Sequence, residues 1–330
     1  MKSLIRGRGF ILGLATAILL AFALPEAGAR GGWLQPEWTT RIGIFVIFLL
    51  QGCLLATQEL WHGSQRHRLN VYVFTWCFLL YPLIAWLLTV VMGGWLQPEV
   101  RMGLIFLGLL PTTVSSAVAL TQAAGGRVSA SIFNTVATNL AGILWVPLIS
   151  LWLFSAGDLP WAQMGKILLQ LSYLIALPLV LGQLLRWIRS DWMDTIRKPA
   201  GWISNAIICF IIYAAIADSI ISGTWSKSGW QIGIQAAVGV LLLMGIATTA
   251  IWFSRHWVGP DSAEQTAAFF CASQKTLATG VPMAAMLFAA LDPSLLGIVL
   301  IPLIIFHPLQ LVVAALLVSL LKNTGQAEGR

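Results

Sequence analysis

The chain has 330 residues, of which 58% are hydrophobic and only 9% are charged, with a formal net charge of +7. Water-soluble domains carry about 25% charged residues, so this composition excludes a soluble enzyme or a secreted domain and predicts a protein embedded in lipid. The basic residues lie in short loops and form no stripe, which argues against nucleic-acid binding. The four cysteines lie in apolar segments without CxxC spacing, so no disulfide framework or zinc site is expected.

Ten segments are long and apolar enough to span a membrane, for which about 20 mainly apolar residues are needed. They lie at about 9–28, 40–58, 71–91, 101–124, 129–154, 163–186, 201–222, 231–254, 262–290 and 294–320. The loops between them are short. The sequence therefore predicts an all-α polytopic membrane protein, with a single transmembrane domain over residues 1–330.

The first segment also has features of a secretory signal. Basic residues precede its apolar run, and Ala27-Gly28-Ala29 resembles a signal-peptidase site. Cleavage there would remove one helix. Because many spans follow, and because the repeat described below requires this helix, we expect it to be retained.

The basic residues also indicate the orientation, because cytoplasmic loops of membrane proteins carry an excess of Lys and Arg. With the N-terminus inside, 13 of the 19 Lys and Arg residues fall in cytoplasmic segments. Five fall in outer segments or outer helix ends, and Lys275 lies within a span. We therefore expect an inner-membrane or plasma-membrane protein with both termini in the cytoplasm.

Ten spans divide into two sets of five, over about 9–155 and 163–320. An odd number of spans per half gives the halves opposite orientations, which is the inverted-repeat plan of many transporters. In such folds, discontinuous helices occupy corresponding places in the two halves, and the substrate site lies between them.

The sequence has one candidate broken helix in each half. The span at 101–124 contains the run PTTVSS (Pro111–Ser116), in which the proline removes a backbone donor and the hydroxyls compete for backbone partners. The span at 262–290 contains CASQKT (Cys271–Thr276), followed by Gly280-Val281-Pro282. Each is the fourth helix of its half. A simple kink explains either break alone, but the matched pair favours a functional site where the two segments meet near the bilayer midplane.

Lys275 lies near the middle of the span at 262–290, where a charge costs about 2.5–3.5 kcal/mol on insertion scales. This lysine can neutralise an anion, carry a coupling proton, or hold two crossing backbones together by donating to carbonyls. The nearest acids within spans, Asp218 and Glu264, lie closer to the membrane edges.

A stripe of small polar residues follows in the span at 129–154. Ser131, Asn134, Thr135 and Thr138 follow helical spacing and lie on one face. Such residues also mediate ordinary helix packing. The functional interpretation is favoured because this helix directly follows the break at Pro111. His307 and Gln310 in the last span are a weaker signal.

Three runs carry a family resemblance: PTTVSSAVALTQAAGGRVSASIFNTVATNLAG (Pro111–Gly142), FFCASQKTLATGVPMAAMLF (Phe269–Phe288) and FHPLQL (Phe306–Leu311). They resemble the bile acid:sodium symporter superfamily, in particular its SBF-like branch. The resemblance implies ten helices, fourth and ninth helices that cross where they unwind, a core of spans 3–5 and 8–10, and a panel of spans 1, 2, 6 and 7.

The resemblance also implies a set of sodium ligands. The positions that match this set are Ser115, Ser116, Ser131, Thr135 and Gln274. Two positions depart from the family pattern: Phe270 stands where the family has a sodium-binding Glu, and Lys275 where it has an Asn. Losing a carboxylate and gaining a cation argues against two bound sodium ions. Lys275 can replace a sodium ion electrostatically, which leaves proton coupling, single-ion coupling or uniport open.

The expected function is a secondary transporter of a small organic anion, with Na⁺ or H⁺ as coupling ion and no other cofactor. No motif supports coupling to ATP. The candidate substrate- or ion-binding residues are Thr112, Thr113, Ser115, Ser116, Ser131, Asn134, Thr135, Thr138, Ser273, Gln274, Lys275 and Thr276. The alternatives are a non-transporting membrane regulator and an intramembrane hydrolase that uses Ser273 and Lys275.

Overall fold

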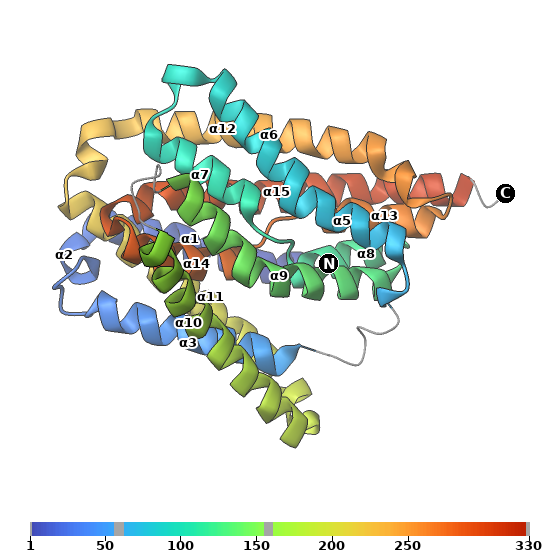
Figure 1. The fold of residues 1–330 in the computed structure, drawn as a ribbon, viewed down its shortest axis with the longest axis horizontal. Helices are drawn as coiled ribbons and strands as arrows, with labels where there is room; N and C mark the ends of the chain where they lie inside the picture. Colours follow the sequence, from blue (N-terminus) through green and yellow to red (C-terminus); the bar gives the residue numbers. More distant parts are fainter. Residues whose placement is uncertain (1, 56–62, 155–160, 328–330) are drawn as a thin grey trace. The chain divides into compact units, whose positions relative to one another are not determined.

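The computed structural model describes residues 2–55, 63–154 and 161–327. Throughout these ranges the regular elements are helices, and no strand occurs in them (Figure 1). This agrees with the predicted all-α class. A helix satisfies its backbone donors and acceptors within the segment, which is what a hydrocarbon solvent requires.

The chain divides into two compact units. Unit 1 comprises Met1–Leu55, Pro147–Gly233 and Ala278–Ile301, and unit 2 comprises Ala56–Val146, Ile234–Leu277 and Pro302–Arg330. Four helices continue from one unit into the other: α9 (Val128–Phe154), α12 (Thr224–Ser254), α14 (Leu277–Ala290) and α15 (Leu296–Ala327). Predicted spans 1, 6 and 7 and most of span 2 fall in unit 1, whereas spans 3 and 4 and most of span 8 fall in unit 2. The boundary passes through spans 5, 9 and 10.

Unit 1 also contains α1 (Lys2–Ala23), α2 (Pro25–Gly28), α3 (Pro36–Leu54), α10 (Trp161–Ile188), α11 (Ser190–Ile221) and η5 (Pro293–Leu295). Helix α3 packs against α10 and α11, and α1 packs against α11. The α3–α10 contact depends on Gly52 and Gly182. A Cβ atom at either position would lie within 3.0 Å of main-chain atoms of the partner helix. Small residues of this kind let membrane helices approach closely.

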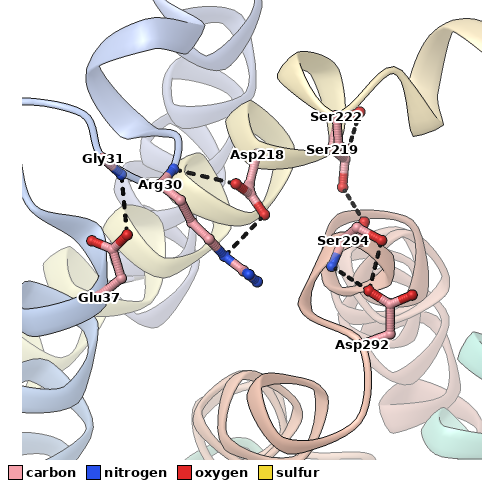
Figure 2. Close-up of polar contacts among 8 residues, drawn as sticks. All are labelled: Arg30, Gly31, Glu37, Asp218, Ser219, Ser222, Asp292 and Ser294. Atoms are coloured by element: carbon pink, nitrogen blue, oxygen red, sulfur yellow. Dashed lines mark hydrogen bonds and ion pairs between the residues drawn. The ribbon is translucent and has the colours of Figure 1, made fainter.

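Polar contacts join the segment after α2 to the end of α11 in unit 1 (Figure 2). The Arg30 N–H donates to Asp218 Oδ1 at 3.2 Å, and Arg30 Nε lies 3.4 Å from Asp218 Oδ2. The residues before Arg30, at the predicted signal-peptidase site, are buried, and a Cβ at Gly28 would meet the Tyr213 ring. These contacts favour retention of the first helix, which stays a prediction.

Unit 2 also contains α5 (His67–Thr75), the π-helical η2 (Trp76–Leu80), α6 (Tyr81–Val91), η3 (Gly93–Trp95), α7 (Pro98–Leu109), α8 (Val114–Ala123), η4 (Arg255–Val258) and α13 (Ser262–Ser273). Helix α13 packs against α5 and α8, and α6 packs against α7. All twelve predicted site residues belong to this unit.

By length and composition, 7 helices among the described residues can cross a membrane, or up to 8 if the bent pair α7–α8 is one span. Of the ten predicted spans, the one at 9–28 corresponds to a shorter apolar helix, Gly9–Ala23. The span at 101–124 is the bent pair, and the span at 262–290 is divided into α13 and α14. The end of the span at 40–58 lies outside the described residues. The multi-pass class is thereby supported, and the count of ten stays a prediction.

Candidate functional site

The helix predicted at 101–124 is interrupted at Pro111, as the sequence indicated. Helix α7 ends at Leu109 and α8 begins at Val114, with an angle of 58° between them. Leu110 is extended (ψ 145°), because the residue before a proline is disfavoured in the helical region. Thr113 caps α8, and its Oγ1 accepts a hydrogen bond from the Ala117 N–H at 3.3 Å.

The helix predicted at 262–290 is interrupted between Ser273 and Leu277 without a proline at the break. Gln274 is extended (φ −87°, ψ 141°). The carboxamide of Gln310, from α15, hydrogen-bonds both main-chain polar groups of the next residue, Lys275. Gln310 Oε1 accepts from the Lys275 N–H at 2.7 Å, and Gln310 Nε2 donates to the Lys275 carbonyl at 2.9 Å. A side chain therefore satisfies main-chain groups that a continuous helix would satisfy itself.

The two unwound segments contact each other through their main chains. The Thr276 N–H donates to the Pro111 carbonyl at 3.0 Å. Asn139 of α9 donates from Nδ2 to the Thr112 carbonyl at 2.8 Å. The structure thus brings together the two breaks that the sequence placed more than 150 residues apart. Their depth in the membrane stays a prediction.

Lys275 is fully buried, with 0% of its surface exposed. Its Nζ donates to the carbonyls of Gly108 and Leu110, both at 2.8 Å, and more weakly to the Cys77 carbonyl at 3.4 Å. The first two carbonyls belong to the C-terminal end of α7. The interruption at Pro111 leaves carbonyls there without intrahelical partners, and this end of a helix carries partial negative charge. The ammonium therefore occupies a site that suits a cation.

The ammonium also contacts η2, through the Cys77 carbonyl, and α6, through the Tyr81 ring. Its Nζ lies 4.1 Å from the centroid of the Tyr81 ring, within the range of a cation–π interaction. The π-helical segment η2 lies between α5 and α6 and contains Cys77. Pro82 follows immediately and cannot donate to the helix. Local widening of the helix at this point positions the Cys77 carbonyl and the Tyr81 ring beside the lysine.

The acids that the sequence suggested as partners of Lys275 bind arginines instead. Asp218 pairs with Arg30 in unit 1, and Glu264 pairs with Arg66 in unit 2. A third ion pair joins Arg127 to Asp261, which also caps the N-terminus of α13. The burial of the Lys275 charge is therefore compensated by main-chain dipoles and an aromatic ring.

The polar stripe on α9 is buried, but its four members differ in their partners. The Ser131 hydroxyl lies 3.3 Å from Thr121 Oγ1 and 3.3 Å from Cys271 Sγ, so it connects α9 to α8 and α13. Asn134 Nδ2 donates to Asn70 Oδ1 of α5 at 2.7 Å. These contacts fit the interpretation of this face as a helix-packing surface around the crossing.

The threonines of the stripe donate to their own helix. Thr135 Oγ1 donates to the Ile132 carbonyl at 2.9 Å, and Thr138 Oγ1 donates to the Asn134 carbonyl at 2.7 Å. Two further predicted hydroxyls, those of Ser115 and Ser116, lie in the first turn of α8, where Ser115 is exposed and Ser116 hydrogen-bonds Thr113.

These residues do not fit the two-sodium donor set that the family resemblance implies. Phe270 is fully buried and makes an edge-to-face contact with Phe269, so an aromatic ring fills the position of the family's carboxylate. The adjacent Lys275 brings a positive charge to the same locus. A bound cation beside it would be repelled and would have no carboxylate ligand at Phe270.

Several buried polar atoms at the crossing have no hydrogen-bond partner among the described residues. They include Thr112 Oγ1 on the first unwound segment, and Ser273 Oγ and Gln274 Oε1 at the second. Ser273 and Gln274 line a small pocket that also contacts Thr248, with room for about one water molecule. Unpartnered buried polar atoms are rare in native proteins. Both unwound segments therefore carry buried polar atoms that can hydrogen-bond a polar ligand or water.

The hydrolase alternative requires the Lys275 amine to contact the Ser273 hydroxyl. The amine instead donates to carbonyls of α7 and η2, and the Ser273 hydroxyl has no partner in the described part of the chain. A Ser–Lys nucleophile pair is therefore not formed.

Sequence reasoning missed several residues of this site. The Gly108, Leu110 and Cys77 carbonyls leave no mark in a sequence, because every residue has one. Asn139 was a visible signal, since it is a carboxamide one turn after Thr135 in an apolar helix.

Comparison with known proteins identifies the family of the chain. Residues 8–323 match the model of the SBF-like CPA transporter family. The uncharacterized protein PA2026 of Pseudomonas aeruginosa is 34% identical over 314 residues, covering 93% of this chain and 91% of that protein. Sodium/bile acid cotransporter 7 is 31% identical in Mus musculus, over 96% of this chain and 93% of the relative. The Danio rerio protein of the same name is 30% identical, over 97% of this chain and 95% of the relative. The match extends over nearly the whole chain and includes both unwound segments, so the chain belongs to the SBF-like CPA transporter family, a family of transporters rather than enzymes.

Proposed function

We propose that the protein is a secondary active transporter of a small organic anion that works by alternating access. In this proposal, ten helices form two inverted repeats of five, over about 9–155 and 163–320, in an inner or plasma membrane with both termini cytoplasmic. The twelve predicted site residues surround the crossing of the two unwound segments, and the substrate binds there.

The observation that carries this proposal is the direct hydrogen bond between the unwound segments, from the Thr276 N–H to the Pro111 carbonyl. Each segment interrupts the fourth helix of its proposed half. Each is also held by a carboxamide from the fifth helix of the same half, Asn139 in the first and Gln310 in the second. Matched breaks with matched supports are expected of an inverted repeat, and such crossings form the substrate sites of many transporters.

We assign Lys275 the role of a built-in cation. Its ammonium donates to the carbonyls at the end of α7, where a bound monovalent cation would otherwise neutralise the helix dipole. Its full burial supports a fixed electrostatic role over direct contact with a substrate. Transport that is largely insensitive to replacing sodium by potassium is expected from this assignment, with proton coupling, single-ion coupling and uniport as the modes left open.

The substrate class is inferred from the relatives. Two of them are named sodium/bile acid cotransporter 7, and a bile acid is an organic anion. An organic anion also suits a site made of neutral hydroxyls, carboxamides and main-chain groups beside a fixed positive charge.

Uptake by purified protein in proteoliposomes tests the function. Labelled taurocholate and a panel of labelled mono- and dicarboxylates serve as probes, with protein-free liposomes as the control. Saturable, protein-dependent uptake of at least one anion is the expected result. Binding of an anion that raises the melting temperature without any uptake would instead indicate the non-transporting regulator.

A further inference from the structure

Gln310 makes three hydrogen bonds at the crossing. It lies in α15 and is 2% exposed. Its Oε1 accepts from the Lys275 N–H, and its Nε2 donates both to the Lys275 carbonyl and to His307 Nδ1 at 3.0 Å. The orientation of the carboxamide is determined by chemistry, because an N–H needs the oxygen opposite it and a carbonyl needs the nitrogen.

Gln310 also has a partner on its own helix, His307, which lies one turn before it. His307 Nδ1 faces the Gln310 amino group and therefore accepts, which requires a neutral imidazole with its proton on Nε2. His307 thus supports the carboxamide in the orientation that the Lys275 peptide needs.

Lys275 is consequently held at two points. Its ammonium is bound by the carbonyls of α7, and its peptide is bound by Gln310. Removing the carboxamide would leave a buried N–H and a buried carbonyl without their partners in an extended segment. Such a segment would lose its fixed conformation, and the lysine would lose its alignment with the end of α7.

We propose that Gln310 is a positioning residue for transport: it clamps the Lys275 peptide to α15, so that the unwound segment at 274–276 and this helix move as one piece. The clamp rests on the proposed function for its role in transport, but the clamp itself is measurable without any substrate.

A matched control exists elsewhere in unit 2. Gln235 of α12 makes the same double contact with a different main-chain segment, accepting from the Gln97 N–H at 3.0 Å and donating to the Trp95 carbonyl at 2.6 Å. Its 8% exposure makes its burial comparable with that of Gln310. A Gln235→Leu variant therefore removes an equivalent clamp without touching Lys275.

Hydrogen–deuterium exchange of the full-length protein in lipid nanodiscs tests the clamp. In Gln310→Leu, exchange of the Lys275 amide should rise at least about tenfold, the effect expected for the loss of one protecting hydrogen bond. In Gln235→Leu, exchange should rise at Gln97 and stay unchanged at Lys275. Wild-type exchange at Lys275 in a folded Gln310→Leu variant would overturn the proposal.

A conservative variant separates positioning from general structural support and decides the question if Gln310→Leu does not fold. In Gln310→Glu, a protonated carboxyl can accept from the Lys275 N–H and donate once to the Lys275 carbonyl, without the second donor that the carboxamide offers His307. An ionised carboxylate has acceptors only, so it repels the Lys275 carbonyl and opens the clamp. Protection of the Lys275 amide, relative to wild type at the same pH, should therefore increase as the pH falls from 8 to 5. Protection that does not vary with pH would contradict the clamp. Failure of the proteoliposome uptake alone would refute transport and leave the clamp intact.

Discussion

Replacing Lys275 with methionine tests whether the ammonium stabilises the crossing. Methionine keeps an unbranched side chain of comparable length and removes the charge. The carbonyls of Gly108 and Leu110 then lose their donor, and the Tyr81 ring loses its cation.

The expected effect follows from these contacts. The two 2.8 Å hydrogen bonds contribute about 1.5–3 kcal/mol each as charge-containing bonds, and the cation–π contact contributes about 2 kcal/mol. Removing the charge also removes its burial cost, about 2.5–3.5 kcal/mol on insertion scales. We therefore expect Lys275→Met to lower the free energy of unfolding by about 2–5 kcal/mol.

Thermal and denaturant unfolding in one detergent measure this difference. Lys166→Met is the control, because this exposed lysine of α10 should change stability by no more than about 0.5 kcal/mol. Ammonium chloride should also stabilise Lys275→Ala more than N-methylglucamine chloride at equal ionic strength, since only the ammonium ion fits between the vacated carbonyls. Wild-type stability of Lys275→Met would refute the reasoning.

Three further predictions concern packing, the crossing and topology. Gly182→Ala should destabilise the protein by about 1–3 kcal/mol, because the added Cβ meets main-chain atoms of α3. At Gly165 a Cβ has open space, so Gly165→Ala should change the free energy of unfolding by no more than about 0.5 kcal/mol in the same assay. Cysteine pairs between 111–116 and 272–276, in a background without native cysteines, should cross-link, and failure of every pair in folded protein would contradict the crossing. A reporter fused after Arg330, which lies outside the described residues, should be active in the cytoplasm, and periplasmic activity would contradict this topology. N-terminal sequencing of the mature protein should find the first helix, and a mature N-terminus at residue 30 would contradict its retention.

The membrane class and both helix breaks could be predicted from the sequence because they depend on local features. An apolar run needs no tertiary information, and Pro111 followed by a run of hydroxyl residues is a local signal for a break, whereas prolines without such a run, such as Pro147 and Pro302, lie inside continuous helices. The second break was recognised from its polar residues, although Gln310 rather than a proline sustains it. The burial of Lys275 also followed from its place within an apolar span.

The partners of Lys275 could not be predicted, because they are main-chain carbonyls on segments far away in the sequence. The π-helical segment around Cys77 has no sequence signature that periodicity detects. The sequence showed that the acids nearest to Lys275 among the spans, Asp218 and Glu264, lie closer to the membrane edges, but it did not show that Arg30 and Arg66 pair with them in the folded chain. Helical spacing placed Thr135 and Thr138 on one face, yet spacing alone does not tell whether a hydroxyl binds a ligand or its own helix.

The central claim is that the buried ammonium of Lys275 takes the place of a coupling sodium ion at the crossing. The most direct test is anion uptake into proteoliposomes with sodium replaced by potassium at constant pH and membrane potential, using wild type and Lys275→Ala. Wild-type uptake of the transported anion should be the same in both salts, and folded Lys275→Ala should transport little in either. Steep sodium dependence of wild-type uptake would contradict it.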